Sequence, residues 1–159
     1  MGEALGTLLS SGDVVALVGE LGAGKTVLVR GIAAGFGCDR SEIHSPSFTL
    51  ANEYACRQEK GSKAVGIEKQ RLAHLDLYRI RSEEELPGIG WDAYMDSRHV
   101  VVVEWADRAP TWLPHDHLQV ALAVLGPDRR RLRVQPTGRR SVQLLCGWVE
   151  SLDVVAELT

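Results

Sequence analysis

The sequence predicts an α/β fold in three layers, with a mixed central sheet and an antiparallel hairpin near the C-terminal end. Two short apolar runs, at 13–18 and 99–104, show no polar alternation, which indicates strands covered on both faces. A segment of helical periodicity follows the first run, and strand-like segments flank Gly126–Asp128. Strands that alternate with helices favour parallel pairing, and the final hairpin adds antiparallel pairing, which makes the sheet mixed.

Length and composition indicate a single globular domain over 1–159. The chain has 159 residues, of which 45% are hydrophobic and 25% are charged. A chain of this length buries about 68–70% of its unfolded surface, so it forms a core without a structural metal. The net charge of −3 argues against a protein that coats DNA or RNA by bulk attraction.

The lack of a recognisable targeting signal and the spacing of the cysteines both favour a cytoplasmic location. No apolar run approaches the roughly 18 residues that cross a bilayer, and the first residues lack a basic segment followed by an apolar one. The three cysteines, Cys38, Cys56 and Cys146, are odd in number, widely spaced and outside any CxxC pair. This pattern predicts neither a zinc site nor a disulfide and fits a reducing cytosol.

The first third of the chain is expected to form a helix, a strand and a second helix. Leucines at helical spacing predict a short helix over 3–10, which Gly12 ends. The apolar run 13–18 forms the strand. Apolar residues that recur every four positions then predict a helix over 26–35.

The middle of the chain is expected to hold two strands separated by a loop. Residues 48–54 predict the first strand, whereas 57–71 are rich in Lys, Glu, Gln and Gly and predict an exposed loop. Residues 72–78 alternate in character and predict the second strand. One face of that strand carries three polar groups, His74, Asp76 and Tyr78.

The C-terminal half begins with a capping box at Ser82 and Glu85, which predicts a short helix ended by Pro87 and Gly88. The strand at 99–104 is the strongest strand signal in the chain and ends in Glu104. Segments 118–125 and 132–134 form the hairpin. An amphipathic terminal helix is predicted from Val142, Leu145, Trp148, Val149, Leu152 and Val155.

A phosphate-binding motif lies between the first strand and the following helix. The pattern GxxxxGK[ST] is satisfied by Gly19, Glu20, Leu21, Gly22, Ala23, Gly24, Lys25 and Thr26. Glycines let successive N–H groups point at phosphate oxygens, and the helix N-terminus adds a positive dipole end. Lys25 reaches the outer phosphates and Thr26 offers a hydroxyl to magnesium. These residues predict a P-loop nucleotide site.

A P-loop ATPase also needs an acidic residue at the end of a neighbouring strand, where it holds magnesium directly or through water. Glu104 and Asp76 are the two candidates. We favour Glu104 for the metal, because it closes four consecutive valines, whereas the strand that ends near Asp76 is interrupted by His74. Asp76 is then expected to orient water or to couple the nucleotide state to a loop, unless it only bonds the backbone at the strand end.

ATP is expected rather than GTP. Guanine-specific proteins use an [NT]KxD segment and a DxxG switch, and neither occurs in this sequence.

Two other functions remain open. A small-molecule kinase would use the same P-loop, with the loop at 57–71 as its lid, and a nucleotide-sensing binding module would not depend on hydrolysis.

Five segments together resemble the TsaE family, also called YjeE, of small bacterial P-loop ATPases. They are Gly19–Thr26, Ser45–Leu50, Asn52–Tyr54, His74–Arg79 and Val103–Trp105. The resemblance implies a role in making threonylcarbamoyladenosine (t6A) beside the anticodon of tRNA. In that family the ATPase acts with TsaD and TsaB, meets tRNA through their complex, and does not itself transfer the threonylcarbamoyl group.

The resemblance also implies roles for individual residues. Lys25 and Thr26 would bind phosphate and magnesium, with Glu104 as the second metal-side group. The segment with Ser45, Ser47 and Thr49 would be a switch-like loop, in which Ser47 stands where the family usually has Thr. Asp76 and Trp105 would be functional as well, although Trp105 also fits simple packing after a buried strand.

Overall fold

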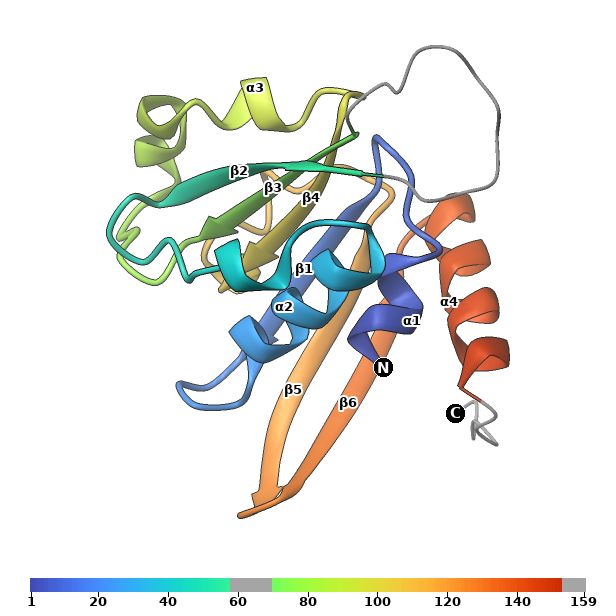
Figure 1. Ribbon diagram of the computed structural model, residues 1–159. Coiled ribbons are helices and arrows are strands. Elements are labelled where there is room, and N and C mark those ends of the chain that lie inside the picture. The colour runs from blue at the N-terminus through green and yellow to red at the C-terminus, as the bar shows by residue number, and fades with distance from the viewer. Residues whose placement is uncertain (58–69, 153–159) are drawn as a thin grey trace, which may run out of the picture.

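The structure is a computed structural model that describes residues 1–57 and 70–152 (Figure 1). Its centre is a six-stranded sheet in the order β2-β3-β4-β1-β5-β6. The strands are β1 (Val14–Gly19), β2 (Ala51–Cys56), β3 (Gln70–Asp76), β4 (His99–Glu104), β5 (Leu118–Gly126) and β6 (Arg129–Pro136). The four inner strands are parallel, whereas β2 and β6 pair antiparallel at the edges. The predicted α/β fold with a mixed sheet and a final hairpin is confirmed.

Helices cover both faces of the sheet. One face packs against α1 (Gly2–Gly6), α2 (Lys25–Gly35) and α4 (Arg139–Ser151), and the other against η2 (Glu83–Ile89), α3 (Trp91–Tyr94) and η3 (Ala106–Arg108). Alternate residues of each inner strand enter the two cores, so Val102 lies on the α2 face and Val103 on the other. All six residues of β4 are buried, as its unbroken run of valines predicts.

The predicted strand at 48–54 begins too early. In the structure β2 starts at Ala51, and Phe48 lies in a turn with 84% of its surface exposed. Leu50 has a left-handed backbone with φ of 67°, which redirects the chain into the strand. Phe48 is therefore an apolar residue that is not part of the core. Most of the predicted loop at 57–71 lies outside the described residues, and its last two residues belong to β3.

Helix boundaries differ in smaller ways from those expected. The first helix is shorter than predicted and ends at Gly6. The capping box at Ser82 and Glu85 is confirmed, but the 3-10 turns of η2 continue through Pro87 to Ile89. Helix α4 buries Leu144 and Trp148, whereas Val142 is 47% exposed. Of the predicted apolar stripe, Trp148, Leu145 and Leu152 pack against the core as expected, Val142 does not, and Val155 lies outside the described residues.

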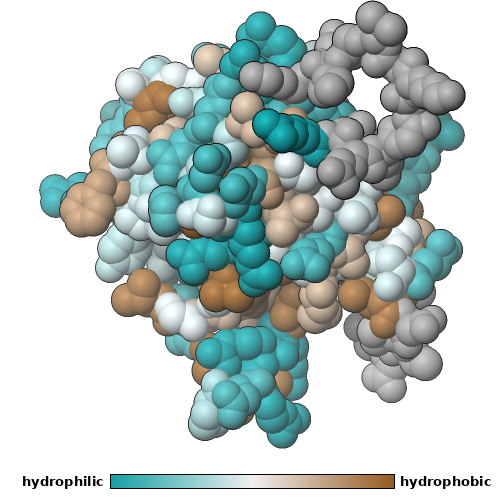
Figure 2. All heavy atoms as spheres, viewed as in Figure 1, coloured by the Kyte–Doolittle hydropathy of each residue, from teal (hydrophilic) through white to brown (hydrophobic). Residues whose placement is uncertain are grey.

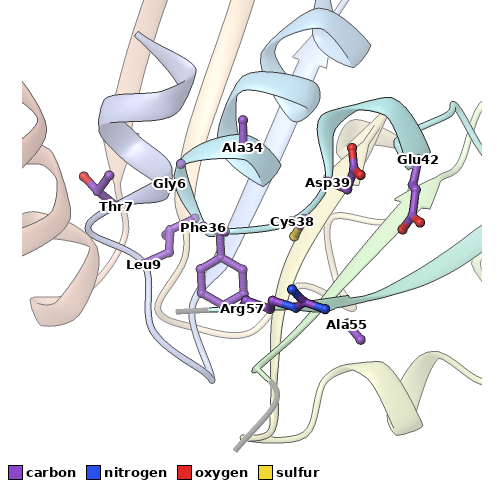
Figure 3. Close-up of a pocket in the computed structure, with 12 residues that line it drawn as sticks. Gly6, Thr7, Leu9, Ala34, Phe36, Cys38, Asp39, Glu42, Ala55 and Arg57 are labelled. Carbon is purple, nitrogen blue, oxygen red and sulfur yellow. The ribbon is translucent and has the colours of Figure 1, made fainter. Parts of the chain in front are cut away.

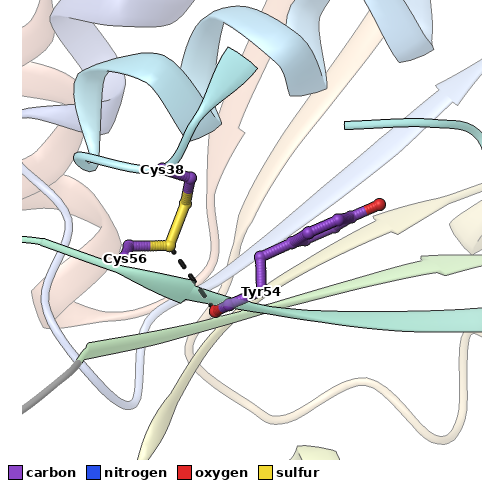
Figure 4. The surroundings of a disulfide bond; sticks show 3 residues. All are labelled: Cys38, Tyr54 and Cys56. Atoms are coloured by element: carbon purple, nitrogen blue, oxygen red, sulfur yellow. Dashed lines mark hydrogen bonds between the residues drawn. A yellow bond between two sulfur atoms is a disulfide. The ribbon is translucent and has the colours of Figure 1, made fainter. Parts of the chain in front are cut away.

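Cys38 and Cys56 form a disulfide, so the prediction of no disulfide is wrong (Figure 4). Cys38 follows α2 and Cys56 ends β2, and the N–H of Arg57 donates to the carbonyl of Gly37 at 2.9 Å. Tertiary structure thus brings together two segments 18 residues apart that no sequence spacing pairs. The cysteines consequently give no support to the predicted cytoplasmic location. Cys146 is free and exposed.

The β5–β6 hairpin extends beyond the body of the sheet (Figure 1). Its tip is covered mostly by hydrophilic side chains (Figure 2). Within 1–57 and 70–152, no helix combines the length and the apolar character needed to cross a bilayer.

Candidate functional site

The P-loop connects the end of β1 to the start of α2, at the carboxyl edge of the parallel strands (Figure 1). Gly24 caps α2 with a φ of 104°, a left-handed conformation that favours glycine. At Gly19 a Cβ would lie 2.4 Å from the carbonyl oxygen of Leu122 in β5, so a side chain there would collide with the backbone. Both glycines are required by the path of the loop.

Lys25 is held inside the loop that precedes it. Its ammonium donates to the carbonyl oxygens of Gly19 at 2.6 Å and Glu20 at 2.9 Å. Burial lowers the pKa of Lys25 from its ordinary value, and the negative charges of Glu104 and Asp76 oppose part of that shift. A cation is therefore fixed at the mouth of the P-loop with carboxylates nearby.

Glu104 ends β4 directly against the P-loop helix. The hydroxyl of Thr26 donates to Oε2 of Glu104 at 3.0 Å, although the two residues are 78 positions apart. The parallel register aligns Asp76 of β3 with Glu104, and strand alternation places both on the α2 face of the sheet. Both carboxylates are buried. The two acidic candidates and Thr26 thus meet at one edge.

His74 supports Glu104 from the next strand. Its Nε2 lies 2.9 Å from Oε1 of Glu104, and both side chains are almost fully buried. A carboxylate only accepts hydrogen bonds, so the ring carries its hydrogen on Nε2. Among the described residues the other ring nitrogen, Nδ1, has no hydrogen-bond partner. The imidazole therefore makes one polar contact, and that contact orients Glu104.

Asp76 holds the segment that contains Ser45 and Ser47. The two serine hydroxyls donate to Oδ2 of Asp76 at 2.9 and 2.7 Å, and they lie 2.6 Å from each other. Oδ1 accepts from the N–H of Tyr78 at 2.9 Å. Asp76 thus makes the backbone contact expected of an ordinary strand end and also anchors a loop.

Trp105 follows Glu104 in a left-handed backbone conformation, with φ of 58°. The ammonium of Lys25 lies 3.7 Å from the centre of its ring, a cation–π contact. The ring of Tyr78 packs against it with centroids 5.1 Å apart. A tryptophan in a rare backbone conformation against the P-loop lysine is part of the site and not only of the core.

These groups surround a cleft of about 390 Å³. Most of the predicted site residues line it: Leu21, Gly22, Gly24, Lys25, Thr26, Ser45, Ser47, Asp76, Glu104 and Trp105. Gly19 and Glu20 contribute through their carbonyl groups, and Ala23 faces a neighbouring groove. Thr49 does not line the cleft, and its hydroxyl donates to Oδ1 of Asn52 at 3.1 Å.

Sequence reasoning missed Tyr78 and Arg79, which also line the cleft. Both follow Asp76 closely, and their place inside the His74–Arg79 segment was the one available signal. It also missed the contact between His74 and Glu104, which depends on the strand order.

A second groove of about 660 Å³ adjoins the P-loop on its other side. The first residues of α1, the first turns of α2 and the tip of the β5–β6 hairpin line it, among them Gly2, Val27 and Pro127. Arg130 joins two of these walls, since its Nε donates to the carbonyl oxygen of Ala23 at 3.2 Å. Ala23 and Gly24 of the phosphate loop are among its lining residues, so this groove lies directly beside the loop.

A cavity of about 680 Å³ lies at the opposite end of α2 (Figure 3). Residues from the ends of α1 and α2 line it, together with Cys38, Asp39 and Arg57. This cavity has a larger volume than the P-loop cleft, but none of the predicted site residues line it.

Comparison with known proteins identifies the family. A sequence model described as "Threonylcarbamoyl adenosine biosynthesis protein TsaE" matches residues 1–132. The chain belongs to the TsaE family. Two TsaE proteins, each named a tRNA threonylcarbamoyladenosine biosynthesis protein, illustrate the similarity. The Bacillus subtilis protein is 36% identical over 135 residues, covering 85% of this chain and 76% of its own length. The Treponema pallidum protein is 37% identical over 133 residues, covering 84% and 89%.

A solved structure agrees with the TsaE assignment. The crystal structure of YdiB from Bacillus subtilis superposes with a TM-score of 0.68 at 29% sequence identity, over 94% of this chain and 84% of that one. The predicted resemblance to the TsaE family is thereby confirmed.

Proposed function

We propose that this chain binds ATP with magnesium in the P-loop cleft, hydrolyses it, and thereby serves the formation of t6A in tRNA. The TsaE names of its relatives support the pathway. The observation that carries the ATPase proposal is the contact between Thr26 and Glu104. It joins the P-loop hydroxyl to a strand-end carboxylate, which is the pair of groups that holds magnesium in P-loop enzymes.

The donor set of the cleft fits a magnesium ion. The side chains at the contact offer oxygen only, from the Thr26 hydroxyl and the Glu104 carboxylate, and hard cations prefer oxygen ligands. We therefore assign these two residues to the metal. A magnesium ion held by these residues would neutralise negative charge on the phosphate groups. His74 keeps the Glu104 carboxylate in place.

The remaining groups suit the nucleotide. Backbone N–H groups from Gly22 to Thr26 surround phosphate oxygens, and Lys25 exchanges its contacts with Gly19 and Glu20 for the outer phosphates. The second groove, beside Ala23 and Gly24, takes the base. Its walls include apolar residues such as Val27 and Leu122, which suit a flat ring.

Asp76 links the nucleotide to a movable element. Its carboxylate both faces the cleft and accepts from Ser45 and Ser47, so a change at the γ-phosphate is transmitted to that loop. In the TsaE family the resemblance implies TsaD and TsaB as partners, and tRNA is met through their complex. The loop is the element that reports the nucleotide state to them.

Calorimetry with ATP tests the proposal, in magnesium and in EDTA. The wild-type chain should bind ATP with magnesium, and Lys25→Ala should bind at least about tenfold more weakly, because a charge-assisted bond to phosphate contributes roughly 1.5–3 kcal/mol. Arg98→Ala is the control, since Arg98 is an exposed cation beside the amino end of β4. Equal affinities of wild type and Lys25→Ala would contradict the proposal.

A further inference from the structure

Two cations line the candidate cleft, and they are held very differently. Lys25 is buried and bonded to the carbonyls of its own loop. Arg79 is exposed, and no carboxylate pairs with it in the described part of the chain. Its guanidinium lies 4.3 Å from the centre of the Phe48 ring. A cation at the rim of a phosphate site, without an anionic partner, has the charge and the freedom to meet an anion there.

The backbone around Arg79 is held by hydrogen bonds. The N–H of Ile80 donates to the carbonyl of Leu77 at 3.0 Å, and both of these flanking residues are buried. The preceding residue, Tyr78, is held by Asp76. Arg79 therefore projects from a rigid turn that begins at the end of β3, beside the two carboxylates.

Phe48 holds the guanidinium only weakly. Its ring is 84% exposed, and cation–π contacts are weakest where water reaches both groups. A bidentate bond between a guanidinium and a phosphate is stronger and more directional. Phe48 also belongs to the loop whose Ser45 and Ser47 are bonded to Asp76. The position of the arginine is thus tied to the loop that senses the nucleotide.

We propose that Arg79 is the arginine that contacts the γ-phosphate of ATP during hydrolysis; this inference rests on the function proposed above. A water oxygen bonds to the γ-phosphorus while the bond to the β–γ bridging oxygen breaks. The electron pair stays on the leaving oxygen of ADP, and inorganic phosphate and a proton are released. Arg79 stabilises the charge on the transferred group and exchanges no proton, because guanidinium stays protonated. Gα proteins, which are P-loop hydrolases with such an arginine in their own chain, still turn over at only about 10⁻² s⁻¹.

The test compares Arg79→Ala and Arg79→Lys with Arg81→Ala, an exposed arginine two positions further on that does not line the cleft. Calorimetry in magnesium measures the affinity for ADP and for AMPPNP, a non-hydrolysable analogue that keeps a γ-phosphoryl group. We expect Arg79→Ala to weaken AMPPNP binding about tenfold or more, with ADP binding unchanged. Turnover should fall by about 10³-fold or more, with only partial recovery in Arg79→Lys. Arg81→Ala should match the wild type, and thermal melting should show all variants folded.

Three outcomes would count against the inference. Unchanged AMPPNP affinity and turnover in Arg79→Ala would overturn the role of Arg79 and leave the ATPase proposal standing. Equal losses for ADP and AMPPNP would place Arg79 away from the γ-phosphate. A wild-type chain that binds neither nucleotide would overturn the proposed function itself.

Discussion

The imidazole Nε2 of His74 lies 2.9 Å from Oε1 of Glu104, with both side chains almost fully buried on neighbouring parallel strands. The other carboxylate oxygen of Glu104 accepts from Thr26. Glu104 is thus fixed at both oxygens, from the sheet on one side and from the P-loop helix on the other.

Removing His74 should weaken magnesium binding without removing a ligand. Replacing a group that orients a metal ligand lowers metal affinity by about 10–100-fold, and we expect a loss of that size in His74→Ala. His74→Gln, which retains a donor, should recover part of it. The measurement is the magnesium dependence of ATP binding by calorimetry.

His99→Ala is the matched control for His74. His99 is a second buried histidine, and it contacts the carboxylates of Asp96 and Glu53 at the amino end of β4. This variant should lose stability but keep the magnesium dependence of the wild type. Equal magnesium effects in the two histidine variants would show that general destabilisation is responsible.

Glu104→Gln should leave the fold intact and strongly slow turnover, since the amide keeps the shape and loses the charge that faces magnesium. The melting temperature and the rate of phosphate release should therefore diverge in this variant. Asp76→Asn should retain magnesium binding. If Asp76→Asn abolishes magnesium binding while Glu104→Gln does not, the two carboxylates have exchanged roles.

Part of this site is readable from the sequence because its signals are local. The P-loop is a contiguous motif between a buried run and a helix, and Glu104 directly follows four valines, so both were predicted. The contact between Thr26 and Glu104 is different. It forms because β1 and β4 are neighbours in the sheet. The two residues are 78 positions apart, and their spacing in the sequence does not reveal this strand order.

The sequence-based errors have the same origin. Phe48 is apolar and was assigned to a strand, but its ring lies in solvent and holds Arg79, so hydrophobicity did not indicate burial there. Cys38 and Cys56 match no spacing motif. They form a disulfide because the chain that follows α2 lies against the end of β2. Both features are tertiary contacts that periodicity does not report.

Reduction of the disulfide between Cys38 and Cys56 should lower stability. It closes a loop with a sequence separation of 18, for which the loss of chain entropy in the unfolded state contributes about 3 kcal/mol. For a protein of this size that corresponds to a fall in melting temperature of about 6–12 °C. Melting with and without dithiothreitol measures it.

Cys146→Ser is the control for the disulfide, because Cys146 is free and exposed. That variant should melt like the wild type and keep its sensitivity to reductant, whereas Cys38→Ser should melt lower and lose that sensitivity. Titration of all three cysteines as free thiols in the native, unreduced protein would show that the bond does not form.

The loop held by Asp76 should matter more for partner response than for nucleotide binding. Ser45 and Ser47 both donate to Asp76, so the double variant Ser45→Ala with Ser47→Ala frees the loop while leaving Lys25, Thr26 and Glu104 intact. We expect slow turnover by the isolated wild-type chain and faster turnover with TsaD, TsaB and tRNA. In the double variant this stimulation should be largely lost, because a loop that no longer follows the γ-phosphate cannot report its state. Ser97→Ala, an exposed serine before β4, should respond to partners like the wild type. Fast turnover by the isolated chain, unchanged by the partners, would contradict partner coupling and favour a free-standing kinase or hydrolase.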